Sequence, residues 1–96
     1  MVQVTFNGKV IARSDDTVVV ENNHYFPIGA VEAEGFSLIE SSTRSFCPWK
    51  GQAFYYDGSL DGEVVKDIAW YYPEPLPKAK HIKDHVAFYK NKVIIE

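Results

Sequence analysis

Hydrophobic and polar residues alternate along most of this chain, and a period of two is typical of strands with one buried face. The first example covers Val2–Phe6 and is followed by Asn7-Gly8, a pair that favours the positive backbone angles of a tight hairpin turn. Similar hydrophobic or β-branched runs recur at short intervals. The strands that they predict cover residues 2–6, 9–13, 17–21, 24–26, 36–40, 52–57, 64–72, 86–89 and 93–95.

Two segments depart from this pattern. Residues 28–34 combine alanine and valine with a glycine, which is poor in a helix interior, so we expect one or two helical turns there. Three prolines at alternate positions within residues 73–77 cannot donate hydrogen bonds to a sheet, so this segment is predicted to be an extended connector. A further helical turn is expected over residues 78–84.

The last two strands, over 86–89 and 93–95, flank a short polar segment and are predicted to pair as a closing hairpin. A chain of 96 residues supports one hydrophobic core, so we expect a single domain over residues 1–96. The predicted fold class is therefore mainly β: a small domain of two antiparallel sheets built from hairpins, with one or two short helical turns.

Composition narrows the classes of function. The formal net charge is -3, so the chain lacks the basic surface of a nucleic-acid-binding protein. Its one cysteine rules out an internal disulfide and a zinc site made of cysteine pairs. No apolar run reaches the roughly 18 residues that span a bilayer, and no signal-peptide pattern is present. We therefore expect a cytoplasmic protein with no metal site and no nucleic-acid or membrane partner, while its cofactors stay unknown.

The densest group of chemically distinctive residues is Ser45–Gly51, which we expect to form a tight turn after a polar loop at residues 41–44. Cys47 is a candidate catalytic nucleophile, because a neighbouring cation such as Lys50 favours the reactive thiolate. The alternative role for Cys47 is a small buried side chain at a turn, since the sequence marks no histidine or aspartate as its partner.

Aromatic residues supply a second feature. Trp70 and Tyr72 are two positions apart in a predicted strand, so their side chains share one face. Together with Trp49 and a basic side chain they predict a pocket for a planar anionic ligand, because rings stack on a flat ligand and cations meet its charge. The alternative is that these rings form the core. The candidate ligand-binding residues are Arg13, Arg44, Ser45, Trp49, Lys50, Trp70 and Tyr72.

Several phrases of the sequence together resemble one family. They are Tyr25-Phe26-Pro27, Ser45-Phe46-Cys47-Pro48-Trp49-Lys50-Gly51-Gln52-Ala53, Ala69-Trp70-Tyr71-Tyr72-Pro73 and Val86-Ala87-Phe88-Tyr89. Over nearly its whole length the chain resembles the domain of unknown function 427 family. The resemblance implies a β-tent-like architecture, in which two antiparallel sheets meet at an angle. Some β-tent relatives hold zinc with paired cysteines, which this chain cannot do with Cys47 alone.

The family is in places labelled nucleotidyltransferase, an activity that requires a Gly-Ser pair followed by a helix and two carboxylates for magnesium. Gly58-Ser59 is followed by Asp61 and Glu63, but this spacing leaves no room for the helix. We interpret residues 58–62 as a hairpin loop instead.

Three functions from different classes remain. The leading hypothesis is the binding of a planar anionic small molecule, such as a nucleotide or a cofactor fragment, in an aromatic and basic pocket. The second is a group-transfer enzyme, either nucleotidyltransferase-like or with Cys47 as its nucleophile. The third is a protein-interaction module that uses the proline connector or an open sheet edge. A homodimer is left open.

Overall fold

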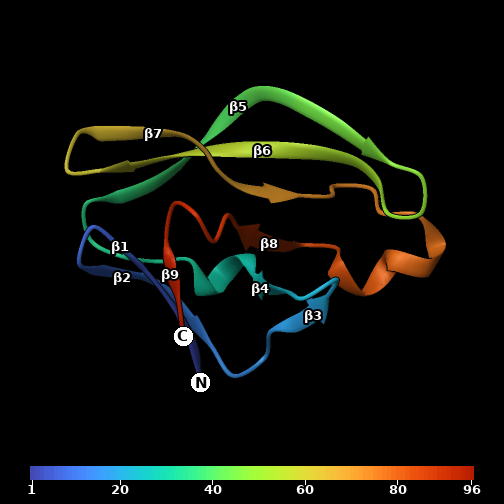
Figure 1. Ribbon diagram of the computed structural model, residues 1–96, viewed down its shortest axis with the longest axis horizontal. Helices are drawn as coiled ribbons and strands as arrows, with labels where there is room; N and C mark the ends of the chain where they lie inside the picture. Colours follow the sequence, from blue (N-terminus) through green and yellow to red (C-terminus); the bar gives the residue numbers. More distant parts are fainter.

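Nine strands form two antiparallel sheets in the computed structural model, which describes residues 1–96 (Figure 1). The strands are β1 (Val2–Phe6), β2 (Lys9–Ser14), β3 (Val18–Val20), β4 (Asn23–Pro27), β5 (Phe36–Cys47), β6 (Gly51–Leu60), β7 (Glu63–Tyr71), β8 (His85–Phe88) and β9 (Ile94–Ile95). Two short 3-10 helical segments, η1 (Ile28–Ala30) and η2 (Pro77–Ile82), lie where helical turns are predicted. The predicted fold class is confirmed. Neither helical segment has the length and hydrophobicity to cross a membrane.

The two sheets differ in size. Three strands form the smaller sheet in the order β2-β1-β9, and six form the larger one in the order β3-β4-β8-β7-β6-β5. Figure 1 shows β5, β6 and β7 as a long layer on one side of the molecule, with both chain ends on the opposite side. The two ends lie together because the backbones of Gln3 and Glu96 exchange two hydrogen bonds, of 2.9 and 3.0 Å.

The closing hairpin predicted for residues 86–89 and 93–95 is wrong. β8 pairs with β4 and with β7, where Ala87 lies opposite Trp70. β9 pairs instead with β1, in the smaller sheet. A turn signal indicates where the chain reverses, but the choice of partner strand depends on hydrophobic contacts between residues that are far apart in the sequence.

The loop predicted at residues 41–44 and the turn predicted at 45–51 are also corrected. Most of these residues lie within β5, a strand of 12 residues, and only Pro48–Lys50 turn the chain. A β-bulge between Glu40 and Arg44 accommodates the extra polar residues within the strand. The polar residues 41–44, which suggest a loop in the sequence, therefore form part of the strand.

The larger sheet buries side chains on both of its faces, because successive residues of a strand point to opposite sides. One side, which we call the sheet-packed face, carries Phe26, Val86 and Phe88 and shares a hydrophobic cluster with the smaller sheet. The other side, the helix-covered face, carries Tyr72 and Ala87 and shares a second cluster with η2. Each face thus has a hydrophobic core of its own.

Substitution of Phe88 tests how much the hydrophobic cluster of the sheet-packed face contributes to stability. Its side chain is fully buried and meets the Phe26 ring edge to face, with ring centres 5.9 Å apart. We expect Phe88→Ala to lower the free energy of unfolding by about 3–5 kcal/mol, because it removes a buried ring and leaves a cavity. Val19→Ala is the control and should change it by less than about 0.5 kcal/mol, since Val19 is exposed. Equal stabilities of the two variants in urea denaturation would contradict this assignment.

Candidate functional site

Four of the predicted site residues lie on the helix-covered face. β5 brings Ser45 and Cys47 to this face, and β7 with the residue after it brings Trp70 and Tyr72. Tyr72 is buried, whereas Cys47 and Trp70 are half-buried and pack against the same hydrophobic cluster. The structure therefore brings the cysteine phrase and the tryptophan phrase of the sequence together.

Lys50, in the turn between β5 and β6, is unusual because its charged side chain is buried. Its ammonium group forms an ion pair with Glu21, in the turn between β3 and β4. The second carboxylate oxygen of Glu21 accepts a hydrogen bond of 3.3 Å from the Trp49 indole. Lys50 Nζ also lies 5.4 Å from the centre of the Tyr72 ring, within the range of cation–π attraction. One carboxylate thus ties two turns together.

The ion pair determines the charge of both partners. Burial alone would lower the pKa of Lys50, but the hydrogen bond to Glu21, with smaller effects of Tyr25 and Tyr72, raises this pKa above its ordinary value. Hydrogen bonds from Lys50 and from Trp49 hold the pKa of Glu21 below its ordinary value of 4.5. Both groups are charged at neutral pH, so the charge of Lys50 is already compensated within the protein.

A series of aromatic rings continues along the same face. The Trp70 indole donates a hydrogen bond of 3.0 Å to the Tyr25 hydroxyl. Tyr89 contacts Trp70, with ring centres 4.6 Å apart, and lies nearly parallel to Tyr55, with ring centres 6.3 Å apart. Tyr55, Trp70 and Tyr89 are half-buried, so solvent reaches part of each ring. We call these three residues the ring group.

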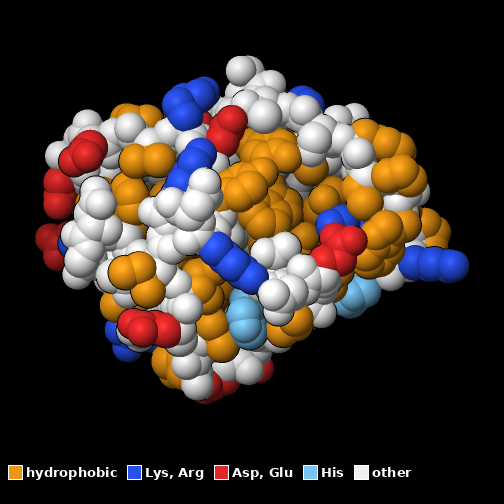
Figure 2. Space-filling view, viewed as in Figure 1, with side chains coloured by type: hydrophobic (Ala, Val, Ile, Leu, Met, Phe, Trp, Pro, Cys, Tyr) orange, Lys and Arg blue, Asp and Glu red, His pale blue; other side chains and the backbone are white.

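A polar hollow of about 270 Å³ adjoins the ring group. Its lining residues come from β5, β6, β7 and the segment after β8, and they are Thr43, Tyr55, Asp67, Tyr89, Asn91 and Lys92. Figure 2 shows hydrophobic side chains gathered in the middle of one face of the molecule, with basic and acidic side chains around them. Rings and charges are therefore adjacent on the surface, as a site for a polar aromatic ligand requires.

Asp67 lies in a bulge of β7 and has a positive φ of 49°. Its carboxylate accepts hydrogen bonds of 2.5 Å from the Ser41 hydroxyl and 2.7 Å from the Thr43 hydroxyl, and these hold its pKa below the ordinary value. The Lys92 ammonium donates to the backbone carbonyls of Lys66 and Asp67, at 2.7 and 3.1 Å, and forms no ion pair. The hollow therefore holds a carboxylate fixed by two hydroxyl groups and an ammonium group without an ion-pair partner, which lies 5.5 Å from the centre of the Tyr89 ring.

Sequence reasoning missed Thr43, Asp67 and Lys92. Two bulges, one in β5 and one in β7, bring Thr43 and Asp67 side by side, and neither bulge has a clear sequence signal. Lys92 reaches them from the segment after β8, where it donates to the carbonyls of Lys66 and Asp67. The available hint was the hydroxyl-rich run at residues 41–43, which we interpreted as a loop leading to the site.

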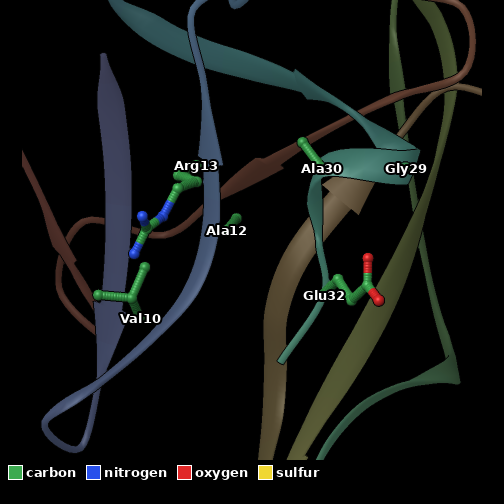
Figure 3. A pocket seen from close by; sticks show the side chains of 6 residues that line it. All are labelled: Val10, Ala12, Arg13, Gly29, Ala30 and Glu32. Carbon is green, nitrogen blue, oxygen red and sulfur yellow. The ribbon is translucent and has the colours of Figure 1, made fainter. Parts of the chain in front are cut away.

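The two candidate arginines do not join this group. Arg44 points from the opposite face of β5, where its guanidinium lies 3.8 Å from the centre of the Phe54 ring. Arg13 belongs to β2 in the smaller sheet and lines a separate hollow of about 360 Å³. In Figure 3 its side chain extends towards Val10 and away from Glu32. Neither arginine is placed to assist the ring group.

Ser45 and Trp49 lie at the margins of the site. The Ser45 hydroxyl is 2.7 Å from the Tyr55 hydroxyl, so Ser45 adjoins the ring group. Trp49 is 38% exposed and lines a different hollow, together with Leu76 and Lys78. The two tryptophans of the chain therefore report on different parts of the surface.

Comparison with models of known protein families assigns the chain to one of them. A family model described as a domain of unknown function (DUF427) matches residues 1–96. The chain belongs to the DUF427 family. This confirms the resemblance seen in the cysteine and tryptophan phrases. No curated protein matches the sequence.

The segment that imitates a nucleotidyltransferase motif has a different structure in this DUF427 domain. Gly58 and Ser59 lie within β6, so the predicted loop over residues 58–62 is shortened to the turn Asp61-Gly62, and β7 follows rather than a helix. No group of three or more His, Cys, Asp or Glu side chains is placed to hold a metal ion.

The buried lysine predicts an asymmetry between two substitutions. Glu21→Gln should lower the free energy of unfolding by about 2 kcal/mol at pH 7, because Lys50 stays buried without its partner. Lys50→Met should cost less than about 1 kcal/mol, because it removes the buried charge and leaves the half-exposed Glu21 to water. Urea denaturation measures the free energy of unfolding of both variants. A larger decrease for Lys50→Met than for Glu21→Gln would contradict the view that Glu21 compensates a buried charge.

The same pair predicts a pH dependence. Because the pKa of Glu21 is lower in the folded than in the unfolded protein, its contribution to stability is present above the ordinary value of 4.5 and is lost as the pH falls through the folded-state pKa. The difference in melting temperature between wild type and Glu21→Gln should therefore shrink as the pH is lowered from 7 to below 4.5. Glu34→Gln, which removes an exposed carboxylate outside any ion pair, is the matched control.

Proposed function

We propose that this DUF427 domain binds a planar anionic small molecule of nucleotide size on its helix-covered face. The flat part of the ligand lies against the ring group, and its anionic part lies beside Lys92. The observation that carries the proposal is the continuity between three solvent-reached rings and a polar hollow that contains an ammonium group without an ion-pair partner.

The ring group supports the recognition of a flat ligand. The Tyr89 ring already packs against both Tyr55 and Trp70, so the positions of the three rings require little further ordering when a ligand arrives. Stacking of a nucleobase on an aromatic side chain contributes about 1–3 kcal/mol. Two such contacts supply much of the affinity that a small ligand needs.

The charges of the site favour Lys92 over Lys50 as the group that meets an anion. Lys50 is buried and paired with Glu21, so a ligand would have to displace that carboxylate. Lys92 and Lys90 instead donate hydrogen bonds to backbone carbonyls, Lys90 at 2.6 Å from that of Asn22, and Lys92 Nζ also lies 5.5 Å from the centre of the Tyr89 ring. Neither lysine forms an ion pair, so the charge of each can attract an anion. Lys50 then supports the site by holding the two turns together.

Asp67 and Thr43 add a requirement for hydroxyl groups. The Asp67 carboxylate is ionised and repels a second anion, but its remaining lone pairs accept hydrogen bonds from a sugar. A ligand with a flat ring, a sugar and one phosphate matches the rings, the carboxylate and the lysine in turn. Nucleotides and nucleotide-like cofactor fragments have this composition.

The group-transfer alternative rests on Cys47, which packs against the hydrophobic cluster of the helix-covered face. This environment fits the structural role of a small apolar side chain. We therefore base the proposed function on binding.

Tryptophan fluorescence tests the proposal directly. Trp49→Phe leaves Trp70 as the only indole, so a fluorescence change in this variant reports on the ring group. Titration with adenosine, guanosine and flavin monophosphates is expected to quench Trp70 and to raise the melting temperature. Lys92→Ala should weaken binding about tenfold, because it removes the charge that faces the phosphate.

Lys78→Ala is the matched control. It removes one exposed lysine that lines the separate Trp49 hollow, so affinity should stay unchanged. Equal losses in Lys78→Ala and Lys92→Ala would show that only net charge matters. No response from Trp70 to any monophosphate would refute binding at the ring group.

A further inference from the structure

Part of the sheet-packed face of β5, β6 and β7 lies at the margin of the first hydrophobic cluster or outside it. We call its residues the bare patch: Glu40, Arg44, Phe46, Phe54, Tyr56 and Tyr71. Among them only Tyr56 packs against the first cluster, as a half-buried side chain. Phe46 is 67% exposed, and Phe54 and Tyr71 belong to neither hydrophobic cluster. Phe54, Tyr56 and Tyr71 are half-buried, so one exposed ring and three partly exposed rings lie together on this face. Contiguous apolar surface of this kind marks interaction sites on small proteins.

Strand pairing determines which residues of the bare patch lie next to each other. Arg44 lies opposite Phe54, which lies opposite Tyr71, and Glu40 lies opposite Tyr56. The ring centres of Phe54 and Tyr71 are 5.8 Å apart, and those of Tyr56 and Tyr71 are 4.5 Å apart. Their packing holds these rings in place before any partner binds. Phenylalanine, tyrosine and arginine are also the side chains that protein interfaces favour.

The charges of the bare patch lack ion-pair partners within the chain. Glu40 accepts a hydrogen bond from the Tyr71 hydroxyl, and Arg44 donates to the backbone carbonyls of Ser41 and Thr43, each at 2.8 Å. Neither residue takes part in an ion pair. Glu40 and Arg44 therefore present one negative and one positive charge on the same face of β5.

One negative and one positive charge on the same strand can be self-complementary. A two-fold axis that lies in the interface, across the strands and midway between Glu40 and Arg44, reverses the direction of β5 in a second copy. Each Glu40 then lies opposite Arg44 of the other copy. Each Phe54, with the Arg44 guanidinium of its own chain over its ring, lies opposite Tyr56 of the other copy. Such an interface is isologous, because the same patch serves both chains.

We propose that the bare patch is a homodimer interface in which two copies of this chain pack face to face, with two Glu40–Arg44 contacts along β5 beside the aromatic rings of β6 and β7. The ring group lies on the opposite face of the larger sheet, so the dimer leaves the ligand site open. The two proposals are therefore independent, and failure of one leaves the other unaffected.

Charge reversal provides the sharpest test. Sedimentation equilibrium of the full chain over a dilution series should show a monomer–dimer equilibrium. Glu40→Arg and Arg44→Glu should each weaken dimerisation about tenfold or more, because each places like charges opposite one another. The double variant, with both substitutions, restores opposite charges and should recover most of the affinity. Circular dichroism confirms that each variant is folded.

Phe46→Ser tests the apolar part of the interface, and it should also weaken dimerisation about tenfold. Ile94→Ser is its control, since Ile94 is 60% exposed but lies on β9 in the smaller sheet, and it should leave the equilibrium unchanged. A wild-type protein that stays monomeric at the highest soluble concentration overturns the proposal. So does a dimer that the bare-patch variants do not weaken, or a double variant that stays as weak as the single ones.

Discussion

The fold depends on one constraint, which is that the inner strands of the larger sheet bury both of their faces. In β8, Val86 and Phe88 contribute to the cluster shared with the smaller sheet, while Ala87 contributes to the cluster shared with η2. A strand of four residues thus belongs to two hydrophobic cores. Because β8 lies between β4 and β7, it also brings the first and second halves of the chain together.

The chemistry of the site follows from this arrangement. Buried Lys50 keeps its charge because the turn between β3 and β4 brings Glu21 within ion-pair distance, and β4, which follows that turn, pairs with β8. A lysine without such a partner would stay in water. The partnership also removes Lys50 as a free cation, which shifts the expected anion contact to Lys92 at the other end of the ring group.

Alternation along the strands produces two aromatic surfaces with different neighbours. Trp70 and Tyr55 face η2, while the adjacent Tyr71 and Tyr56 face the other way and form part of the bare patch. The sequence indicated that Trp70 and Tyr72 share a face, and the structure places both in the same cluster. The sequence did not indicate that one of these surfaces carries a polar hollow. Nor did it indicate that the other surface carries two opposite charges without ion-pair partners.

The sequence by itself determined the mainly β class, the positions of most strands and the family, because alternation and turn residues are local properties. Only the tertiary structure decided that β8 and β9 belong to different sheets, that Arg44 lies away from Cys47, and that Glu21 compensates Lys50. Periodicity specifies which side chains share a face, but contacts between distant residues select the partner strand. Bulges then decide which polar groups meet, and they depend on how neighbouring strands must bend to pack.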